Sequence, residues 1–400
     1  MISRILFGVA VSLICATAVA QTPTNTVKIG VLSDFSGVFS AWGGQGSVVA
    51  TDMAIEDFRK ANPGFPYQIQ VVQGDFQLKP DLAVAITKKW MDEGVSAIVD
   101  VPISAAALAV ADQVKGTKVA ALMSGPAAND LVVKHCSPNM VHWTYDQYSL
   151  GSQTAKTMIE RGGKSWFFIT QDSVGGLALE NGARPLISAA GGKILGSIKN
   201  PVGQSDFSSQ LLQAQASNAD VIAINQGGSD TVNAVKQARE FGIKGNGQKL
   251  VLTWAQLTDI KGMGLGIAQG LVFSEAFYWD TNDSTRAFSK RFAARYDGRM
   301  PTAVQAGAYS VVLHYLKGVA AAKSSEAPAV IAAMKSIPVS DDAFGHGVLR
   351  DDGRMVHDVL VVQVKEPGMS KGSWDLYKVL KVVPGKDAFR PASRECSLVH

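Results

Sequence analysis

Short runs of β-branched and other apolar residues alternate with longer amphipathic stretches along most of the chain. Residues 27–33 form the first such run, and residues 47–59 follow with Ala54, Ile55 and Phe58 at helical spacing. Alternation of this kind is typical of a parallel sheet covered by helices. The pattern therefore predicts an α/β fold.

The strand and helix unit recurs in two series, the second of which begins near residue 149. Further strands are predicted at 67–74, 97–101, 118–123, 166–170, 193–198, 220–225 and 249–253. Helices are predicted between them at 80–93, 105–114, 149–161, 176–190, 207–217 and 230–241. Two similar α/β halves, or lobes, are expected.

After residue 273 the pattern changes to three helices, predicted at 285–296, 303–322 and 327–334. A hairpin with an Asp352-Gly353 turn is predicted next, followed by strands at 357–365 and 374–382. Three closing helices are more than the second lobe needs, so we expect them to return to the first. Lobe 1 then comprises 21–143 plus 277–348, and lobe 2 comprises 144–276 plus 349–400.

Composition agrees with a folded chain of two domains, because 46% of the 400 residues are hydrophobic and 18% are charged. The formal net charge of +4 comes from charges that are interspersed rather than clustered. Neither a nucleic-acid stripe nor a polybasic membrane patch is indicated, so a polyanionic partner is not expected.

The first 20 residues have the pattern of a cleaved secretory signal peptide: Arg4, an uncharged apolar core and an A-x-A site before Gln21. A retained membrane anchor and a lipoprotein attached through Cys15 are the alternatives. No later stretch reaches 18 uncharged apolar residues. We expect a soluble mature protein that lies outside the cytoplasm and is not embedded in the membrane.

Loss of Cys15 with the signal peptide leaves Cys136 and Cys396, an even pair in an oxidising compartment. A disulfide between them is the simplest expectation, and two unrelated buried thiols are the alternative. No CxxC or HExxH pattern occurs, and we expect neither a metal nor a cofactor.

Three motifs suggest catalysis or nucleotide binding, and their contexts argue against each. The Gly162–Ser165 segment lacks the earlier glycine of a P-loop, and the Gly43–Gly46 segment lacks dinucleotide spacing, although it suits a small anion. Residues 368–372 match the G-x-S-x-G elbow around Ser370, but no strand-to-helix turn is predicted there. We therefore expect a binding protein without catalytic residues, and keep a secreted hydrolase as the alternative.

Four segments together resemble the branched-chain-amino-acid type of periplasmic substrate-binding protein of ABC transporters. They are residues 27–37 (VKIGVLSDFSG), 122–128 (LMSGPAA), 217–223 (SNADVIA) and 301–309 (PTAVQAGAY). The resemblance implies a type I periplasmic binding protein fold: two Rossmann-like lobes with parallel central sheets, joined by three crossovers. It also implies a ligand held between closing lobes and delivered to an inner-membrane ABC permease.

The resemblance places candidate ligand residues on the loops after the strands, where α/β proteins bind ligands. Ser104, Ala105, Ser124 and Gly125 stand where the family holds a carboxylate. The other candidates are Phe39, Trp42, Thr144, Tyr145, Asp172, Ser173, Gln226, Trp254 and Phe277.

One departure from the family concerns the ligand's ammonium group. Amino-acid binders carry an acidic residue after the strand predicted at 249–253, whereas this chain continues Trp254, Ala255, Gln256. A buried ammonium without an ionised partner is costly, unless Asp172 or Asp230 takes that role. Residues 135–146, with the late Cys396, resemble the aromatic-acid-binding subgroup. We expect a benzoate-like or phenylpropenoate-like ligand; branched-chain amino acids, small amides and a ligand-sensing receptor domain are the alternatives.

Overall fold

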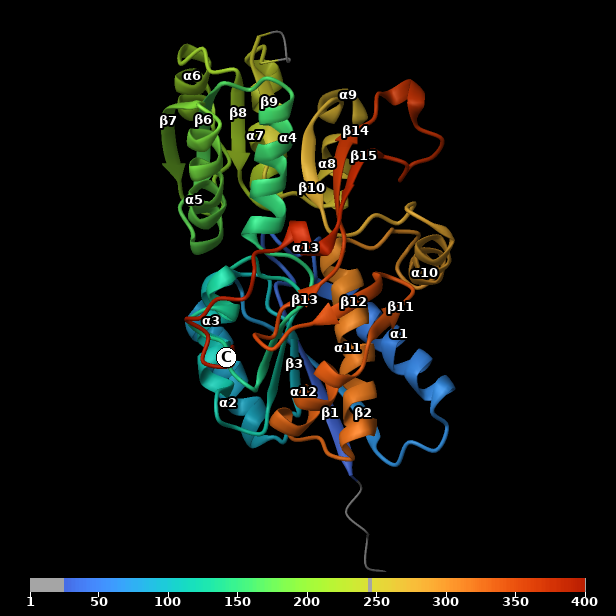
Figure 1. Cartoon of the computed structure of the whole chain (residues 1–400). Coiled ribbons are helices and arrows are strands. Elements are labelled where there is room, and N and C mark those ends of the chain that lie inside the picture. The colour runs from blue at the N-terminus through green and yellow to red at the C-terminus, as the bar shows by residue number, and fades with distance from the viewer. Residues whose placement is uncertain (1–24, 244–246, 400) are drawn as a thin grey trace, which may run out of the picture.

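Two α/β lobes lie end to end in the computed structural model of the chain, which describes residues 25–243 and 247–399 (Figure 1). Each lobe has a central sheet between layers of helices, as the alternating pattern predicted. The predicted signal peptide, residues 1–20, lies outside the described residues.

The sheet of lobe 1 is wholly parallel, with the strand order β2-β1-β3-β4-β5. Its strands are β1 (Thr26–Ser33), β2 (Gln68–Asp75), β3 (Ala97–Asp100), β4 (Ala120–Met123) and β5 (Met140–His142). Side chains along β1 alternate between two apolar clusters, with Val27, Ile29 and Val31 on one face and Leu32 on the other. The period of two in the sequence thus supplies both faces of this sheet.

Helices from distant parts of the sequence cover the lobe 1 sheet. One face carries α2 (Pro80–Asp92) and α3 (Ser104–Val114). The other carries α1 (Gly44–Ala61) together with α10 (Asp283–Ala293), α11 (Ala303–Ala322) and α12 (Ala327–Ser336). The three late helices therefore pack on lobe 1; the exact lobe boundaries stay a prediction.

The sheet of lobe 2 has the order β15-β14-β10-β9-β8-β6-β7. Its parallel strands are β6 (Ser165–Gln171), β7 (Lys193–Asn200), β8 (Val221–Asn225), β9 (Lys249–Leu252) and β10 (Val272–Glu275). The strands β14 (Val359–Val364) and β15 (Tyr377–Val383) add to it antiparallel. The expectation of parallel central sheets therefore holds for lobe 1 and for five strands of lobe 2, but not for its last two.

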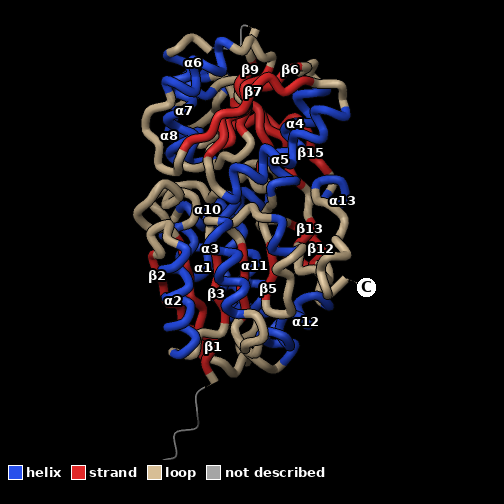
Figure 2. The backbone as a smooth tube through the Cα atoms, turned by 90° about the vertical axis from the view of Figure 1, so that its left-hand side faces the viewer, coloured by secondary structure: helices blue, strands red, loops and turns tan. Residues whose placement is uncertain are grey.

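Helices pack on both faces of the lobe 2 sheet (Figure 2). They are α4 (Gln153–Glu160), α5 (Val174–Ala189), α6 (Ser208–Ala216), α7 (Ser229–Glu240), α8 (Leu257–Met263) and α9 (Leu265–Ala268). A π-helical turn, η2 (Tyr148–Ser152), precedes α4 and forms the start of the helix predicted at 149–161.

A small sheet of β11 (Val339–Asp341), β12 (Gly345–Leu349) and β13 (Met355–Val356) lies beside lobe 1, and it contains the predicted hairpin. Short helical turns also occur in both lobes: η1 (Asn129–Val132) in lobe 1 and η3 (Pro367–Met369) in lobe 2. The last helical turn is α13 (Gly385–Ala388). Several of the shortest elements, β5, β10, β11, α8 and α9, were not predicted, because three to seven residues carry too little periodicity to identify an element.

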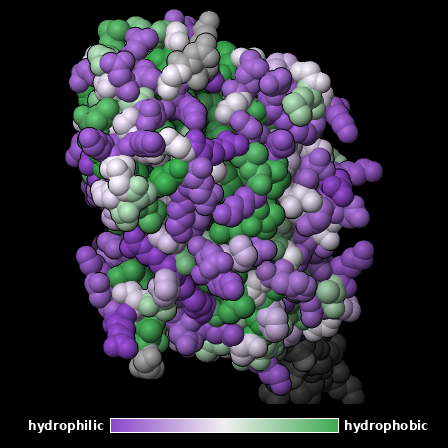
Figure 3. All heavy atoms as spheres, turned by 45° about the horizontal axis from the view of Figure 1, so that its top comes forward, coloured by the Kyte–Doolittle hydropathy of each residue, from purple (hydrophilic) through white to green (hydrophobic). Residues whose placement is uncertain are grey.

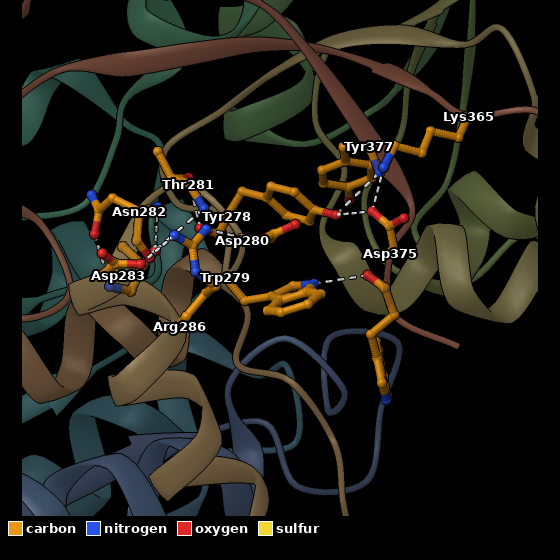
Figure 4. Close-up of polar contacts among 12 residues, drawn as sticks. Tyr278, Trp279, Asp280, Thr281, Asn282, Asp283, Arg286, Lys365, Asp375 and Tyr377 are labelled. Carbon is orange, nitrogen blue, oxygen red and sulfur yellow. Dashed lines mark hydrogen bonds and ion pairs between the residues drawn. The ribbon is translucent and has the colours of Figure 1, made fainter. Parts of the chain in front are cut away.

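Three crossovers join the lobes, after β5, after β10 and after β13. Figure 4 shows how the second one is fixed: Tyr278 and Lys365 both reach the carboxylate of Asp375. The indole of Trp279 donates to the carbonyl of Trp374 at 2.8 Å. This crossover is therefore tied to the loop before β15 of lobe 2.

The surface of lobe 2 seen in Figure 3 mixes polar residues with smaller apolar patches. Within the described part of the chain, no helix is long and apolar enough to cross a membrane. The expected disulfide is present, and it joins Cys136 of lobe 1 to Cys396 over a sequence separation of 260.

We expect Gly30→Ala to destabilise lobe 1. The ring of Trp90 lies over Gly30, so that a Cβ there would come within 2.5 Å of two ring carbons. Overpacking of this kind costs about 1–3 kcal/mol, to be measured by urea unfolding. Gly266→Ala is the control, because no atom lies within 4 Å of its added Cβ; equal stability of the two variants would contradict the prediction.

Candidate functional site

A cavity of about 600 Å³ lies between the two lobes. Every lining residue lies at or after the carboxyl end of a parallel strand in one lobe or the other, and most are apolar. Lobe 1 contributes Phe39, Leu78, Pro80, Ile103, Ser104 and Ala105, and lobe 2 contributes Gln171, Asp172, Ser173, Val174, Gly175, Leu177, Val202 and Trp254. The position is the one at which α/β proteins bind small ligands.

Two helices begin at this cavity, one from each lobe. Ser104 is the first residue of α3, and Ser173 caps α5 by accepting a hydrogen bond from Gly176 N at 3.1 Å. Helix N-termini present backbone N–H groups and a partial positive charge, so both ends favour an anion. The buried hydroxyl of Ser104 has no hydrogen-bond partner among the described residues. It is therefore free to bind a ligand atom.

Three aromatic rings form the inner wall of the site. Phe39 and Trp42 come from the loop after β1, and Trp254 comes from the loop after β9 in the other lobe. The ring of Trp42 contacts Phe39 and Trp254 edge-on, with centroid separations of 5.0 Å in both cases. Phe39 and Trp254 line the cavity, whereas Trp42 is fully buried behind them.

A hydrogen bond between the lobes holds Trp42 in place. Its indole Nε1 lies 2.9 Å from both carboxylate oxygens of Asp259, which is the third residue of α8 in lobe 2. Asp259 also accepts a hydrogen bond from Gln256 N at 2.9 Å. Burial raises the pKa of Asp259 to about 7, and the two hydrogen bonds oppose that rise by favouring the ionised form.

Two further hydrogen bonds connect the neighbours of Trp42 and Asp259. The side-chain oxygen of Gln256 accepts from Ala303 N, at the start of α11 in lobe 1, at 2.9 Å. The hydroxyl of Thr302 in turn donates to the carbonyl of Trp42 at 2.5 Å. We call these five residues the interlobe latch: Trp42, Asp259, Gln256, Thr302 and Ala303. Because two of its hydrogen bonds, Trp42 to Asp259 and Ala303 to Gln256, join different lobes, the structure is that of a closed form.

Six of the residues expected at the site line the cavity: Phe39, Ser104, Ala105, Asp172, Ser173 and Trp254. Trp42 belongs to the latch instead. Tyr145 and Gly125 lie deeper in lobe 1, where the Tyr145 hydroxyl donates to the Gly125 carbonyl at 2.8 Å. The indole N–H of Trp254 lies near that hydroxyl without reaching hydrogen-bond geometry.

The remaining candidates lie away from the cavity lining. Ser124 and Thr144 are buried against Gly307 of α11, and neither hydroxyl has a partner among the described residues. Gln226 is held within lobe 2 by Asn200, at 2.7 Å from its amide nitrogen. Phe277 packs on Phe288 and Phe344, in the second crossover. The structure gives these residues packing or hydrogen-bonding roles, and it does not bring Gln226 or Phe277 to the cavity.

The start of α1 is also closed to a ligand, although the Gly43–Gly46 segment suited a small anion. Gly44 N donates to the hydroxyl of Ser33 at 2.9 Å, and that hydroxyl donates to Asp100 at 2.7 Å. Burial raises the pKa of Asp100 to about 7. The helix end is therefore satisfied inside lobe 1, and a carboxylate lies close to it.

The sequence alone did not reveal the buried acidic residues in and beside the interlobe latch. No acidic residue follows β9 directly, but Asp259 lies one helical turn further on and Glu275 ends β10. Burial raises the pKa of Glu275 well above its ordinary value, and one of its oxygens has no partner among the described residues. Asp259 stands at a helix-capping position of α8. Because α8 was not predicted from the sequence, this capping position could not be recognised.

Ser370 lies in a loop after η3 and not at a strand-to-helix elbow. Its hydroxyl donates to the carbonyl of Gly372 at 2.8 Å. The described residues around its crevice include Lys261 and Pro367 but no histidine. The surroundings of Ser370 give no support to the hydrolase alternative.

Two lobes with parallel strands that end at a shared cavity define the class of bilobal, type I ligand-binding proteins. Comparison with known families makes the assignment specific, because the Periplasmic binding protein family matches residues 26–372. The chain belongs to this family.

Solved structures of similar proteins agree with this assignment. A periplasmic binding protein from Burkholderia mallei is 38% identical, with a TM-score of 0.89 over 94% of this chain and 100% of its own. A branched-chain amino acid ABC transporter periplasmic ligand-binding protein from Burkholderia xenovorans is 39% identical, with a TM-score of 0.81 over 92% and 97%.

A curated relative is more distant. The Leu/Ile/Val-binding protein homolog 6 of Brucella melitensis is 25% identical over 58% of this chain. The match spans 59% of that relative's length.

We expect Gly228→Ala to weaken ligand binding by about tenfold or more, as measured by calorimetric titration. Gly228 has a φ of +62°, and a Cβ there would lie 2.0 Å from the Val38 carbonyl of the other lobe. Closure would therefore meet a direct clash. Gly270→Ala is the control, because it has a φ of +80° but no atom within 4 Å. Equal affinities of the two variants would show that the lobes do not meet here during binding.

We expect Asp259→Asn to reduce the pH dependence of stability. The folded-state pKa of Asp259, about 7, exceeds the ordinary 3.8, so the folded state holds a proton that the unfolded state releases. The contribution of Asp259 to the free energy of unfolding is therefore largest below pH 4. It is lost as the pH rises toward 7, and it no longer changes above pH 7.

The measurement is the free energy of unfolding in urea at pH 5 and at pH 8. The loss of stability between these two values should be smaller in Asp259→Asn than in the wild type. Asp172→Asn, at an exposed carboxylate, is the matched control. An unchanged loss in Asp259→Asn would mean that Asp259 titrates normally in the folded protein.

Proposed function

We propose that the protein is the periplasmic receptor of an ABC importer, and that it binds a small aromatic carboxylate between its lobes. Ligand binding favours the closed form, which is presented to the permease, and the ligand shifts this equilibrium by its differential affinity for the two forms. The observation that carries the proposal is the cavity itself, where hydrogen-bond donors from both lobes stand against an apolar wall.

The polar groups of the cavity support a carboxylate. The N-termini of α3 and α5 and the free hydroxyl of Ser104 are all donors, and they come from different lobes. Gly175 lies close enough to Ser104 that a Cβ on it would come within 3.4 Å of the hydroxyl oxygen. One anion can therefore engage both lobes at once, and so reward closure.

The apolar wall supports a flat ligand body. Phe39 and Trp254 offer ring surfaces, and Leu78, Ile103 and Leu177 line the rest of the cavity. Aromatic contacts add about 0.5–1.5 kcal/mol per pair beyond the burial of area. The same fold holds 4-hydroxybenzoate in a protein of Rhodopseudomonas palustris that is 20% identical, with a TM-score of 0.81.

One observation favours a second candidate, a branched-chain amino acid. Asp172 lines the cavity, and its carboxylate is the lobe 2 acid that an ammonium group needs. That carboxylate is 57% exposed and lies 3.8 Å from Lys199. An ammonium bound there would stay at the solvent-facing rim, where an ion pair adds only about 0–1 kcal/mol. We therefore rank this candidate second.

A thermal-shift screen tests the ligand class. We expect 4-hydroxybenzoate or cinnamate to raise the melting temperature, since a ligand at 100 times its Kd adds about 2.7 kcal/mol to stability. Leucine and isobutyramide should have no effect. Stabilisation by leucine alone would reject the aromatic proposal in favour of the second candidate.

Two variants assign the contacts of the stabilising compound. Ser104→Ala should weaken binding of the carboxylate, because it removes the free hydroxyl donor at the start of α3. Asp172→Asn should weaken an amino acid and leave or improve an aromatic acid, because it removes only a negative charge. If Asp172→Asn weakened an aromatic acid and Ser104→Ala did not, the carboxylate of the ligand would not lie at the start of α3.

A further inference from the structure

The last described segment of the chain runs from lobe 2 back to lobe 1. In Figure 1 it leaves α13 at the level between the lobes and descends along lobe 1 toward the C label. Its far end is fixed by the Cys136–Cys396 disulfide, and both sulfur-bearing residues are buried. Cys136 lies between η1 and β5 of lobe 1.

The near end of this segment is anchored in lobe 2. Ala388 and Phe389 are buried in one apolar cluster with Trp166 of β6 and Val383 of β15. The side-chain amide of Gln153, in α4, donates to the carbonyl of Asp387 at 2.9 Å. A large movement of residue 389 would therefore disrupt the core of lobe 2.

Between these anchors the segment is held loosely. Its first residue has two contacts: the carbonyl of Arg390 accepts from Arg350 at 2.6 Å, and its guanidinium lies 5.0 Å from the ring centroid of Tyr148. Residues 391–399 form no hydrogen bond or ion pair with any other described part of the chain. Pro391, Ser393 and Glu395 instead face a cavity of about 450 Å³ that separates them from lobe 1. The disulfide is what holds this stretch to lobe 1.

The length of the segment sets an upper limit on how far its anchors can separate. Seven residue steps lead from Phe389 to Cys396. A fully extended chain spans at most about 3.3–3.6 Å per residue, so these two Cα atoms cannot be more than about 25 Å apart while the disulfide is intact. The turn at residues 394–395 shows that this stretch is not fully extended in the closed form.

We propose that residues 390–396 act as a strap, a covalently anchored fourth connection that limits the opening of the lobes. The inference rests on the proposed function in one respect, that the lobes open and close. Opening would straighten the strap until its length stops the movement. Excluding the most open conformations lowers the entropy of the open ensemble, and this shifts the equilibrium toward closure and ligand binding.

The test compares unliganded proteins by small-angle X-ray scattering at neutral pH. In Cys136→Ser/Cys396→Ser the strap is free, and we expect a larger radius of gyration and maximum dimension than in the wild type. A second variant keeps the disulfide but carries eight Gly/Ser residues between Ser393 and Arg394, which add up to about 28 Å of reach. It should expand in the same way.

The insertion separates a tether from a local staple. If only the double-serine variant expands, the disulfide stabilises lobe 1 locally and the strap is refuted; if neither expands, the strap does not limit opening. The same insertion after Gly368, in the short helical turn η3 of lobe 2 where no atom lies within 4 Å of an added Cβ, is the control and should leave the scattering unchanged. Circular dichroism melts establish that all variants are folded.

The scattering comparison is made without ligand, so its outcome is independent of the ligand class. Failure of every aromatic acid in the thermal-shift screen would reject the proposed ligand and leave the strap standing. Wild-type scattering curves that match the closed structure both with and without an identified ligand would reject lobe opening, and the strap with it.

Discussion

The site depends on the burial of one indole between two lobes. Trp42 is completely enclosed, and its N–H has a carboxyl acceptor only because Asp259 comes from the opposite lobe. Breaking that contact exposes an aromatic ring and removes the N–H from its acceptor. A buried polar group without a partner costs about 1–3 kcal/mol. Burial of the indole ring and formation of its hydrogen bond to Asp259 must therefore occur in the same movement.

This contact links the cavity to the interlobe latch. Phe39 and Trp254 reach the cavity from opposite lobes, and Trp42 touches both rings from behind. A ligand that packs on the two outer rings therefore acts on the same aromatic cluster that the latch holds. Closure and ligand recognition are thus parts of one packed unit, which has discrete arrangements because close-packed interiors do not deform continuously.

Two kinds of connection restrain the lobes, and they act at opposite limits of the movement. The latch contacts favour the closed form, since they exist only when the lobes meet. The proposed strap acts at the other limit, because a tether stores no energy until it is extended. The crossover at Tyr278 is fixed to lobe 2 by Asp375, so bending there must occur on its lobe 1 side.

The sequence determined the alternation of strands and helices, the return of the late helices to lobe 1 and the pairing of Cys136 with Cys396. It did so because period-two and period-3.6 patterns are local properties, and because only two cysteines remain after residue 20. Six residues that line the cavity were also predictable, since the loops after parallel strands converge at one edge of a sheet. The tertiary structure alone decided the rest. Asp259 meets Trp42 across a sequence separation of 217, and Gln226 turns away from the cavity toward Asn200. Which side chains meet across a cleft depends on how two independently folded sheets are oriented, and no local pattern encodes that orientation.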